Sequence, residues 1–337
     1  MTPPYVPSRR GVGSFPGAAS VRSDATPPNL PPLPGQAIHH PVEPLDLALL
    51  ADLPSLELRA RFIMDAFLSG LHRSPRKGSS VEFAEYRNYQ YGDDLRRVDW
   101  RLYGRTDRLR VKQTEHETQM RVFLVLDTSG SMNYTSRPGE LLSKIDFARA
   151  MLAACALLAM RQGDAFGLAL IGAGLTDYLK PKAAPSQWRS LLGKLDQART
   201  GGTTGLANGL EELGEILPPR SLVIIASDFY DEGERFQQVL RRYRFERQEV
   251  VALQVLDPIE IDFDQDWSGT FHDAETSSRL ILDASAVRAG YLERFRAFLG
   301  RVSERVRSER GDHAVLRTDA SPARALGYYL AHRERRL

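Results

Sequence analysis

The stretch Arg121–Met132, RVFLVLDTSGSM, decides how the rest of the chain folds. A short unbroken apolar run, here Val122 to Leu126, that ends in turn residues is typical of a strand buried on both faces of a parallel sheet. Open α/β sheets place their ligand sites at the carboxyl ends of such strands. Asp127, Ser129 and Ser131 follow this run at a spacing of two, so an extended loop turns their oxygens to one side. Hard oxygens of this kind suit a divalent cation such as Mg²⁺, although a Ser/Gly turn without an ion fits the triplet as well.

Similar buried runs recur along the chain and alternate with helical patterns. Strands are expected over residues 164–174, 221–229, 249–257 and 313–318. Helices are expected over about 141–161, 185–195, 206–217, 233–246 and 285–310, with a closing helix in SPARALGYYLAHRERR. Residues 258–283 are expected to form an inserted hairpin. This alternation predicts an α/β fold with a doubly wound, mainly parallel sheet and right-handed crossovers.

The composition bounds the class of protein. The 337 residues carry a formal net charge of +2, which offers no general reason to expect nucleic acid as a partner. The single cysteine, Cys155, lies in the apolar run MLAACALLAM and is expected to be a core residue in a reducing compartment. No apolar run is long enough for a transmembrane segment, and the N-terminus lacks the apolar core of a signal peptide. We therefore expect a cytoplasmic location, with a membrane-bound partner left open.

The chain divides into three parts. Residues 1–45 are rich in Pro, Gly and Ser and are expected to be a disordered tail. Residues 54–119 contain an amphipathic helical pattern and then a segment dense in arginine and aromatic residues, so a helix and a small β region are expected there. Acidic residues offset the arginines in this segment, which favours ion pairing or a protein interface over phosphate binding. Residues 120–335 form the expected main domain.

Candidate oxygens follow three of the expected structural elements. Asp127, Ser129 and Ser131 follow the first strand, Thr203 and Thr204 lie in the Gly-rich turn GGTTG before a helix, and Asp228 ends the strand SLVIIASD. The carboxyl ends of parallel strands share one edge of a sheet, so these groups are expected to converge on a single ion.

The three pieces DTSGSM, GGTTGLANGL and IIASDF resemble the metal-ion-dependent adhesion site of von Willebrand factor A domains. The resemblance implies that Ser129 and Ser131 ligate Mg²⁺, or Mn²⁺ or Ca²⁺, directly. It implies that Asp127 and Asp228 act through water, and that Thr204 completes the protein ligands. The turn has one residue more than the common Gly-Gly-Thr form, so Thr203 stays open as the alternative. In that family, a partner's acidic side chain takes the remaining position on the ion.

The preceding segment, VEFAEYRNYQYGDDLRRVDWRLYGRTDRLRVKQTEHE, resembles a bacterial family called domain of unknown function 58. In that family a G-D-D-x-R-x-x-D-W-R string precedes a von Willebrand factor A-like domain. Members are often linked with MoxR-type AAA+ ATPases, which the resemblance implies as a partner. Seven residues of the segment are candidate partner-binding positions: Arg87, Asp93, Asp94, Arg96, Asp99, Trp100 and Arg101.

The leading hypothesis is a non-enzymatic, Mg²⁺-dependent interaction module or adaptor that works with such an ATPase in assembly or maturation of protein complexes. Its partners are that ATPase, an acidic side chain of a client protein, or both. One alternative is a metal-dependent phosphoryl-transfer enzyme that uses Asp127. The chain lacks G-x-x-x-x-G-K-[ST], H-E-x-x-H and G-x-S-x-G motifs, and Ser129 stands where aspartyl phosphotransferases carry a second Asp. The other alternative is a structural scaffold with a vacant metal site.

Overall fold

The structure is a computed structural model. It describes residues 46–73, 85–88, 104, 110–113, 119–202, 205–230, 233–263, 268–272 and 279–334. The expected tail over residues 1–45 lies outside these ranges. Its disorder, and the boundaries expected at 54–119 and 120–335, stay predictions.

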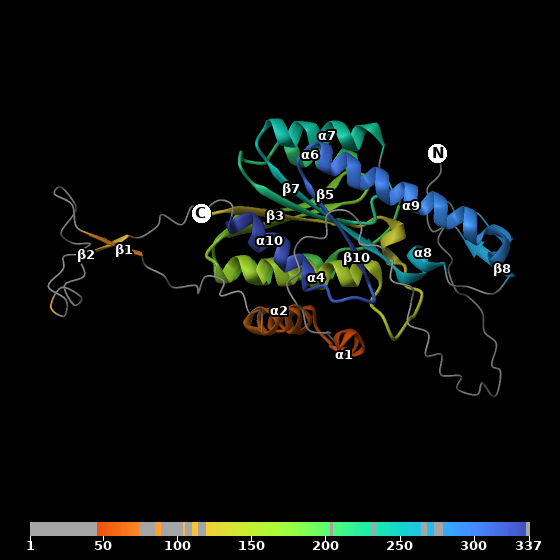
Figure 1. Cartoon of the computed structure of the whole chain (residues 1–337), viewed down its shortest axis with the longest axis horizontal. Helices are drawn as coiled ribbons and strands as arrows, with labels where there is room; N and C mark the ends of the chain where they lie inside the picture. Colours follow the sequence, from red (N-terminus) through yellow and green to blue (C-terminus); the bar gives the residue numbers. More distant parts are fainter. Residues whose placement is uncertain are drawn as a thin grey trace.

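A six-stranded sheet lies at the centre of the protein (Figure 1). Its strand order is β10-β7-β6-β3-β4-β5. Its strands are β3 (Arg121–Asp127), β4 (Ala165–Ile171), β5 (Leu175–Lys182), β6 (Leu222–Ser227), β7 (Glu249–Leu256) and β10 (Asp312–Arg317). Five of them run parallel, and β5 pairs antiparallel with β4. The predicted α/β fold with a doubly wound, mainly parallel sheet is thus confirmed. The edge strand β5 was not expected, because LTDYLKPK has no apolar run and its residues are only partly buried.

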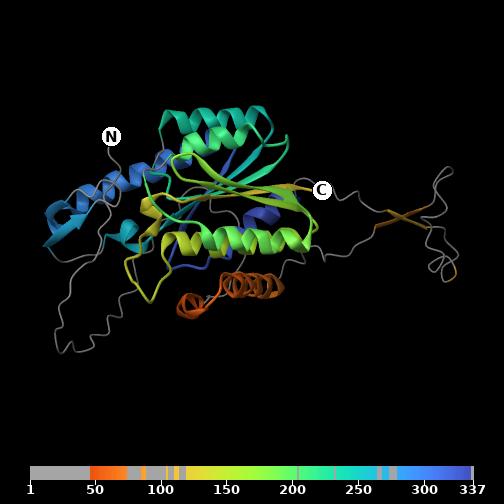
Figure 2. The same ribbon diagram turned by 180° about the vertical axis from the view of Figure 1, so that it is seen from behind.

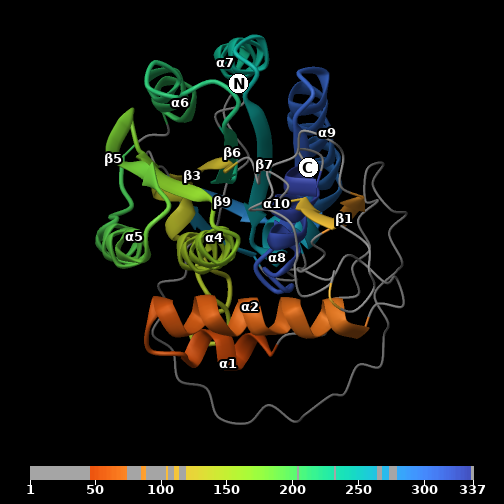
Figure 3. The same ribbon diagram turned by 90° about the vertical axis from the view of Figure 1, so that its left-hand side faces the viewer.

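Helices cover both faces of the sheet. On one side lie α6 (Leu206–Gly214), α7 (Glu234–Phe245) and α9 (Ala284–Ser308), and on the other α4 (Lys144–Arg161), α5 (Pro185–Gln197) and α10 (Arg324–Glu334). Figure 3 shows α6 and α7 on one side of the strands and α4 and α5 on the other. The buried apolar residues form two main clusters, one on each face. The fully buried strands explain the unbroken apolar runs in the sequence.

A further layer lies outside α4. Helices α1 (Leu47–Asp52) and α2 (Leu56–Arg73) run beneath α4 on its side away from the sheet (Figure 2). The amphipathic helix expected here is confirmed, and its residues Ile63, Met64 and Phe67 are buried. Because α4 lies between the sheet and α2, it is apolar nearly all round. Cys155 is buried in α4, as expected, and burial raises the pKa of its thiol to about 12.

The remaining elements are short. β1 (Glu85–Asn88) and β2 (Arg110–Gln113) pair as an antiparallel two-stranded sheet. The expected insertion is confirmed: α8 (Pro258–Asp262) follows β7, and β8 (Ser268–His272) pairs antiparallel with β9 (Arg279–Asp283). In the part of the chain that the structure describes, no helix combines the length and the apolar character needed to cross a membrane.

Candidate functional site

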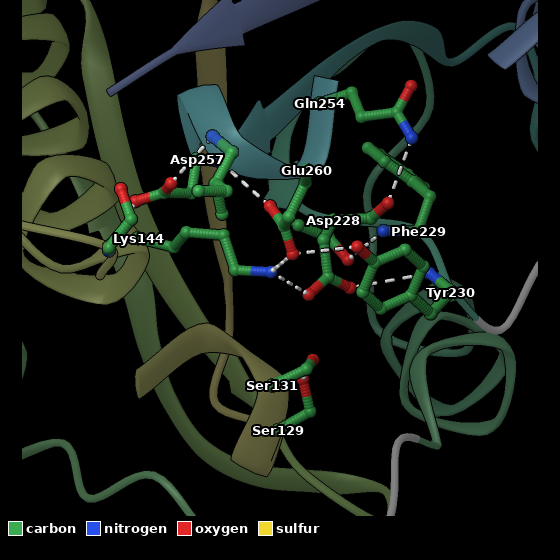
Figure 4. Close-up of polar contacts among 12 residues, drawn as sticks. Ser129, Ser131, Lys144, Asp228, Phe229, Tyr230, Gln254, Asp257 and Glu260 are labelled. Carbon is green, nitrogen blue, oxygen red and sulfur yellow. Dashed lines mark hydrogen bonds and ion pairs between the residues drawn. The ribbon is translucent and has the colours of Figure 1, made fainter. Parts of the chain in front are cut away.

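The predicted triplet lies at the carboxyl end of β3. Asp127 is its last residue, and its Oδ1 accepts a hydrogen bond of 2.8 Å from the backbone N–H of Ser129. A 3-10 turn, η2 (Gly130–Asn133), follows and carries Ser131. The hydroxyls of Ser129 and Ser131 face each other at 3.2 Å, and both side chains are buried (Figure 4). The structure therefore brings the three oxygens of DTSGS together, as predicted.

The neighbouring strand β6 brings the second aspartate to the same place. Leu126 pairs with Ala226 in the parallel register, so Asp127 and Ser227 follow side by side. The Ser227 hydroxyl donates a 2.6 Å hydrogen bond to Asp127 Oδ2, and Asp228 comes next along the chain. Burial first, and then the charge of Asp228, raise the pKa of Asp127 to about 7, although the bonds from Ser227 and Ser129 work against that shift. Two buried carboxyls that repel each other in this way would gain from a cation between them.

The Gly-rich turn docks against the triplet through its backbone. Gly201 N–H donates to Thr128 O at 3.0 Å, and Gly130 N–H donates to Gly202 O at 3.3 Å. A side chain at Gly205 would place its Cβ 2.1 Å from Ala173 O, so this close approach requires glycine. Thr203 and Thr204 lie outside the described residues, and the choice between them stays a prediction.

A buried lysine that the sequence analysis did not identify completes the cluster. Lys144, the first residue of α4, places its Nζ 2.8 Å from Asp228 Oδ2 and 2.8 Å from Glu260 Oε1, and all three side chains are at most 1% exposed. Figure 4 shows the ammonium group between the two carboxylates. Burial alone would lower the pKa of Lys144, but the charges of Asp228 and Glu260 outweigh it and raise that pKa above its ordinary value.

Further hydrogen bonds tie this cluster to α8. Tyr230 OH donates to Glu260 Oε1 at 2.7 Å, and Glu260 Oε2 accepts the backbone N–H of Asp257 at 2.7 Å. Asp257 in turn caps α8 and, through Oδ2, accepts the N–H of Ser136 at 2.8 Å. These contacts join the loops that follow β3, β6 and β7 into one polar network at the carboxyl edge of the sheet (Figure 4).

The residues present fit a hard divalent cation. Mg²⁺ binds oxygens at about 2.1 Å in an octahedral array, which puts neighbouring ligands about 3 Å apart. The 3.2 Å between Ser129 Oγ and Ser131 Oγ agrees with such a pair. Within the described ranges no three His, Cys, Asp or Glu side chains converge as a metal site.

Some signals for the missed residues exist in the sequence. D-P-I-E over residues 257–260 is a helix capping box, which predicts that Glu260 turns back toward the end of β7. Lys144 offers no comparable signal, because a lysine at the start of a helix is ordinarily exposed. Of the seven candidate partner-binding residues, Arg87 lies in β1, and the other six lie outside the described residues.

Comparison with known proteins identifies relatives. The family model described as "Protein of unknown function DUF58" matches residues 85–298. An uncharacterized protein of Mycobacterium tuberculosis, Rv1480, is 30% identical over 249 residues, which cover 71% of this chain and 77% of the relative. The uncharacterized protein Mb1516 of Mycobacterium bovis matches to the same extent.

Two solved structures show a more distant similarity. The conserved hypothetical protein BatB from Bacteroides thetaiotaomicron is 13% identical with a TM-score of 0.41, over 64% of this chain and 99% of that one. A von Willebrand factor type A protein from Catenulispora acidiphila is 13% identical with a TM-score of 0.38, over 64% of this chain and 42% of that one. The family-model match and the mycobacterial relatives show that this chain belongs to the DUF58 family.

Proposed function

We propose that this protein is a non-enzymatic interaction module whose binding surface is completed by a divalent cation, Mg²⁺ or a similar ion. The observation that carries the proposal is the convergence of Asp127, Ser129, Ser131 and Asp228 at one edge of the sheet. Hydroxyl and carboxylate oxygens are the ligands that Mg²⁺ prefers. When bound, the ion supplies an open coordination position for an oxygen of the partner.

The charges of the cluster support the proposal. Four buried carboxyls lie in the network, those of Asp127, Asp228, Asp257 and Glu260. Lys144, the buried lysine among the described residues, contacts two of them, Asp228 and Glu260. The four carboxyls outnumber the one ammonium group, so a bound cation would offset negative charge that Lys144 leaves uncompensated.

The partner we propose is a MoxR-type AAA+ ATPase, an acidic side chain of a client protein, or both. Two resemblances support this partner. The G-D-D…D-W-R segment resembles a family whose members are often linked with MoxR-type ATPases, and the DTSGSM site resembles a family in which a partner's acidic side chain binds the ion. The site geometry is compatible with a carboxylate partner, because that group is itself a hard oxygen ligand. The segment around Arg87 to Arg101 is proposed as the second contact surface.

Binding is favoured over phosphoryl transfer by the environment of Asp127. Both of its carboxylate oxygens already accept hydrogen bonds, from Ser129 N–H and from the Ser227 hydroxyl. Ser129 also occupies the position where aspartyl phosphotransferases carry a second Asp. The alternative, a phosphoryl-transfer enzyme, would be supported if the wild type hydrolysed an aryl phosphate and the Asp127→Asn variant did not.

The first experiment measures cation binding through thermal stability. A ligand that binds the folded state raises Tm, by an amount that grows with ligand concentration. We expect Mg²⁺ or Mn²⁺ to raise Tm of the wild type after EDTA treatment, and Ser129→Ala to reduce this rise. Ser190→Ala, on the exposed face of α5, is the matched control and retains the full response. An equal Tm with and without cations would support the scaffold with a vacant site.

The second experiment measures partner binding. The ATPase is pulled down with the full chain, with Mg²⁺ and with EDTA, for the wild type, Ser129→Ala and Ser190→Ala. We expect EDTA and Ser129→Ala each to reduce capture. Capture that neither treatment changes would contradict a partner contact bridged by the ion.

A further inference from the structure

The candidate cation site already contains a positive charge of the protein's own. Lys144 is fully buried, and its ammonium bridges Asp228 Oδ2 and Glu260 Oε1 at 2.8 Å each. The ammonium also lies 5.0 Å from the centre of the Tyr230 ring. These three contacts and the complete burial of the side chain hold its charge beside Asp228.

This position restrains Asp228. Its Oδ2 is occupied by the Lys144 ammonium, and its Oδ1 accepts the backbone N–H of Tyr230 at 3.3 Å. Each carboxylate oxygen keeps a second lone pair, so these contacts do not block coordination, but an ion that ligates Asp228 directly would have to share this carboxylate with the ammonium. A divalent ion near Ser129 and Ser131 would, in addition, feel the repulsion of the ammonium in a site with little water.

We propose that Lys144 is a positioning residue that acts as an internal cation: it holds Asp228 as an outer ligand and weakens the binding of the divalent ion, while Glu260 offsets its charge. This inference rests on the proposed cation site. It goes beyond that site because it proposes that Lys144 and Glu260, which are not ligands, set the affinity for the divalent cation. A weakly held ion would exchange readily, so that a partner's carboxylate contributes a decisive share of the stability of the bound state.

The proposal predicts that substitutions of Lys144 and of Glu260 change the affinity for divalent cations in opposite directions. Lys144→Met removes the positive charge and frees Asp228, so divalent cations bind more tightly. Glu260→Gln removes a negative charge but keeps an oxygen that accepts hydrogen bonds, so the ammonium is less offset and cations bind more weakly. Because Lys144 pairs with both Asp228 and Glu260 in a buried cluster, we expect a change of one charge there to shift the affinity for cations by about tenfold or more.

A purely structural role predicts a different pattern. Breaking a buried ion pair leaves an uncompensated charge, so both variants would lose stability. Their affinity for cations would then change in the same direction or not at all.

The experiment is a titration of the full chain with Mn²⁺ and with Mg²⁺, followed by calorimetry and by the rise of Tm. It compares the wild type, Lys144→Met, Glu260→Gln and the double variant, whose net charge equals that of the wild type. Lys194→Met is the matched control, since Lys194 pairs with Asp177 away from the site and is partly exposed. We expect a dissociation constant at least about tenfold lower for Lys144→Met and higher for Glu260→Gln, with the double variant between them.

The outcomes separate this inference from the proposed function. If the wild type binds cations and the two single variants do not shift affinity in opposite directions, the role of Lys144 is wrong and the cation site stands. If Lys144→Met binds cations and the wild type does not, Lys144 is an internal cation and the cation dependence of the wild type is wrong. If neither binds, both are wrong. Should Lys144→Met fail to fold, weaker binding by Glu260→Gln supports the inference, and unchanged or tighter binding overturns it.

Discussion

The Ser227 hydroxyl donates a hydrogen bond of 2.6 Å to Asp127 Oδ2 and thereby joins the carboxyl ends of β6 and β3. The same hydroxyl oxygen accepts the backbone N–H of Phe229 at 2.9 Å. Ser227 thus orients the first aspartate of the site and, at the same time, shapes the chain on both sides of Asp228. Both functions depend on the parallel register of the two strands.

Ser227→Ala is expected to destabilise the fold by about 1–3 kcal/mol, because it leaves Asp127 Oδ2 and the N–H of Phe229 without their partner in a buried site. Urea denaturation measures the change in the free energy of unfolding. Ser190→Ala on α5 serves as the control and should change that free energy by less than about 0.5 kcal/mol. A Ser227→Ala protein as stable as the control would contradict the importance of this bond.

Tyr329→Phe is expected to destabilise the attachment of α10. The Tyr329 hydroxyl donates a short hydrogen bond to Asp164 Oδ2, which also accepts Arg333 Nε at 3.0 Å, while Asp164 Oδ1 accepts the N–H of Met120. Losing one bond to this buried carboxylate costs about 1–3 kcal/mol. Thermal unfolding of Tyr329→Phe is compared with that of Tyr328→Phe. Tyr328 is a partly buried neighbour of Tyr329 in the same helix. Equal stability of the two variants would argue against the Asp164 contact.

His332 is expected to make stability depend on pH on the alkaline side. Its Nδ1 lies 2.7 Å from Glu249 Oε2 and its Nε2 lies 2.8 Å from Asp312 Oδ2. Burial opposes protonation, but the hydrogen bonds and charges of Asp312 and Glu249 outweigh it and raise the pKa of His332. A raised folded-state pKa contributes stability that is fully present below the unfolded value of about 6.5 and is lost as pH rises through the folded value.

His332→Gln measures this contribution. We expect the variant to be less stable than the wild type by about 1–3 kcal/mol near pH 6, and the difference to shrink as pH rises through the raised folded-state pKa of His332. Denaturation in urea at a series of pH values gives both curves. A difference that stays constant over the whole range would show that the charge of His332 is not involved.

His313 is expected to have the opposite effect, on the acid side. Burial, and then the charge of Arg307, lower its pKa to about 4, and Nε2 of the ring lies 3.0 Å from Gln254 Oε1. The folded state therefore binds fewer protons than the unfolded state, so stability falls as pH drops from about 6.5 toward 4.

His313→Gln is expected to remove part of that acid-induced loss, which Tm measured between about pH 7 and 4 reports. The His332→Gln variant is the comparison, because its loss of stability lies on the other side of neutrality. An unchanged acid slope in His313→Gln would contradict a buried neutral imidazole.

The pattern of the sequence determined the central sheet and half of the site. A strand that is apolar over five or more consecutive residues must be buried on both faces, which a sheet between two layers of helices provides. This requirement predicts the parallel strands β3, β4, β6 and β7. Once those strands are parallel, Asp127, Ser129, Ser131 and Asp228 must share an edge. The sequence also indicated the insertion between β7 and α9, with WSGTFHD and RLILD as the two arms of a hairpin.

Only the tertiary structure decided the charge at that edge. Lys144 meets partners that are 84 and 116 residues away in the chain, and no local pattern reports contacts of that separation. Strand β5 owes its place to pairing with β4, and the apolar outer side of α4 owes its burial to α2. The local periodicity of the sequence therefore determined that Asp127, Ser129, Ser131 and Asp228 share this edge of the sheet. The folded chain decided which cation of its own lies beside them, because that contact depends on packing between distant elements.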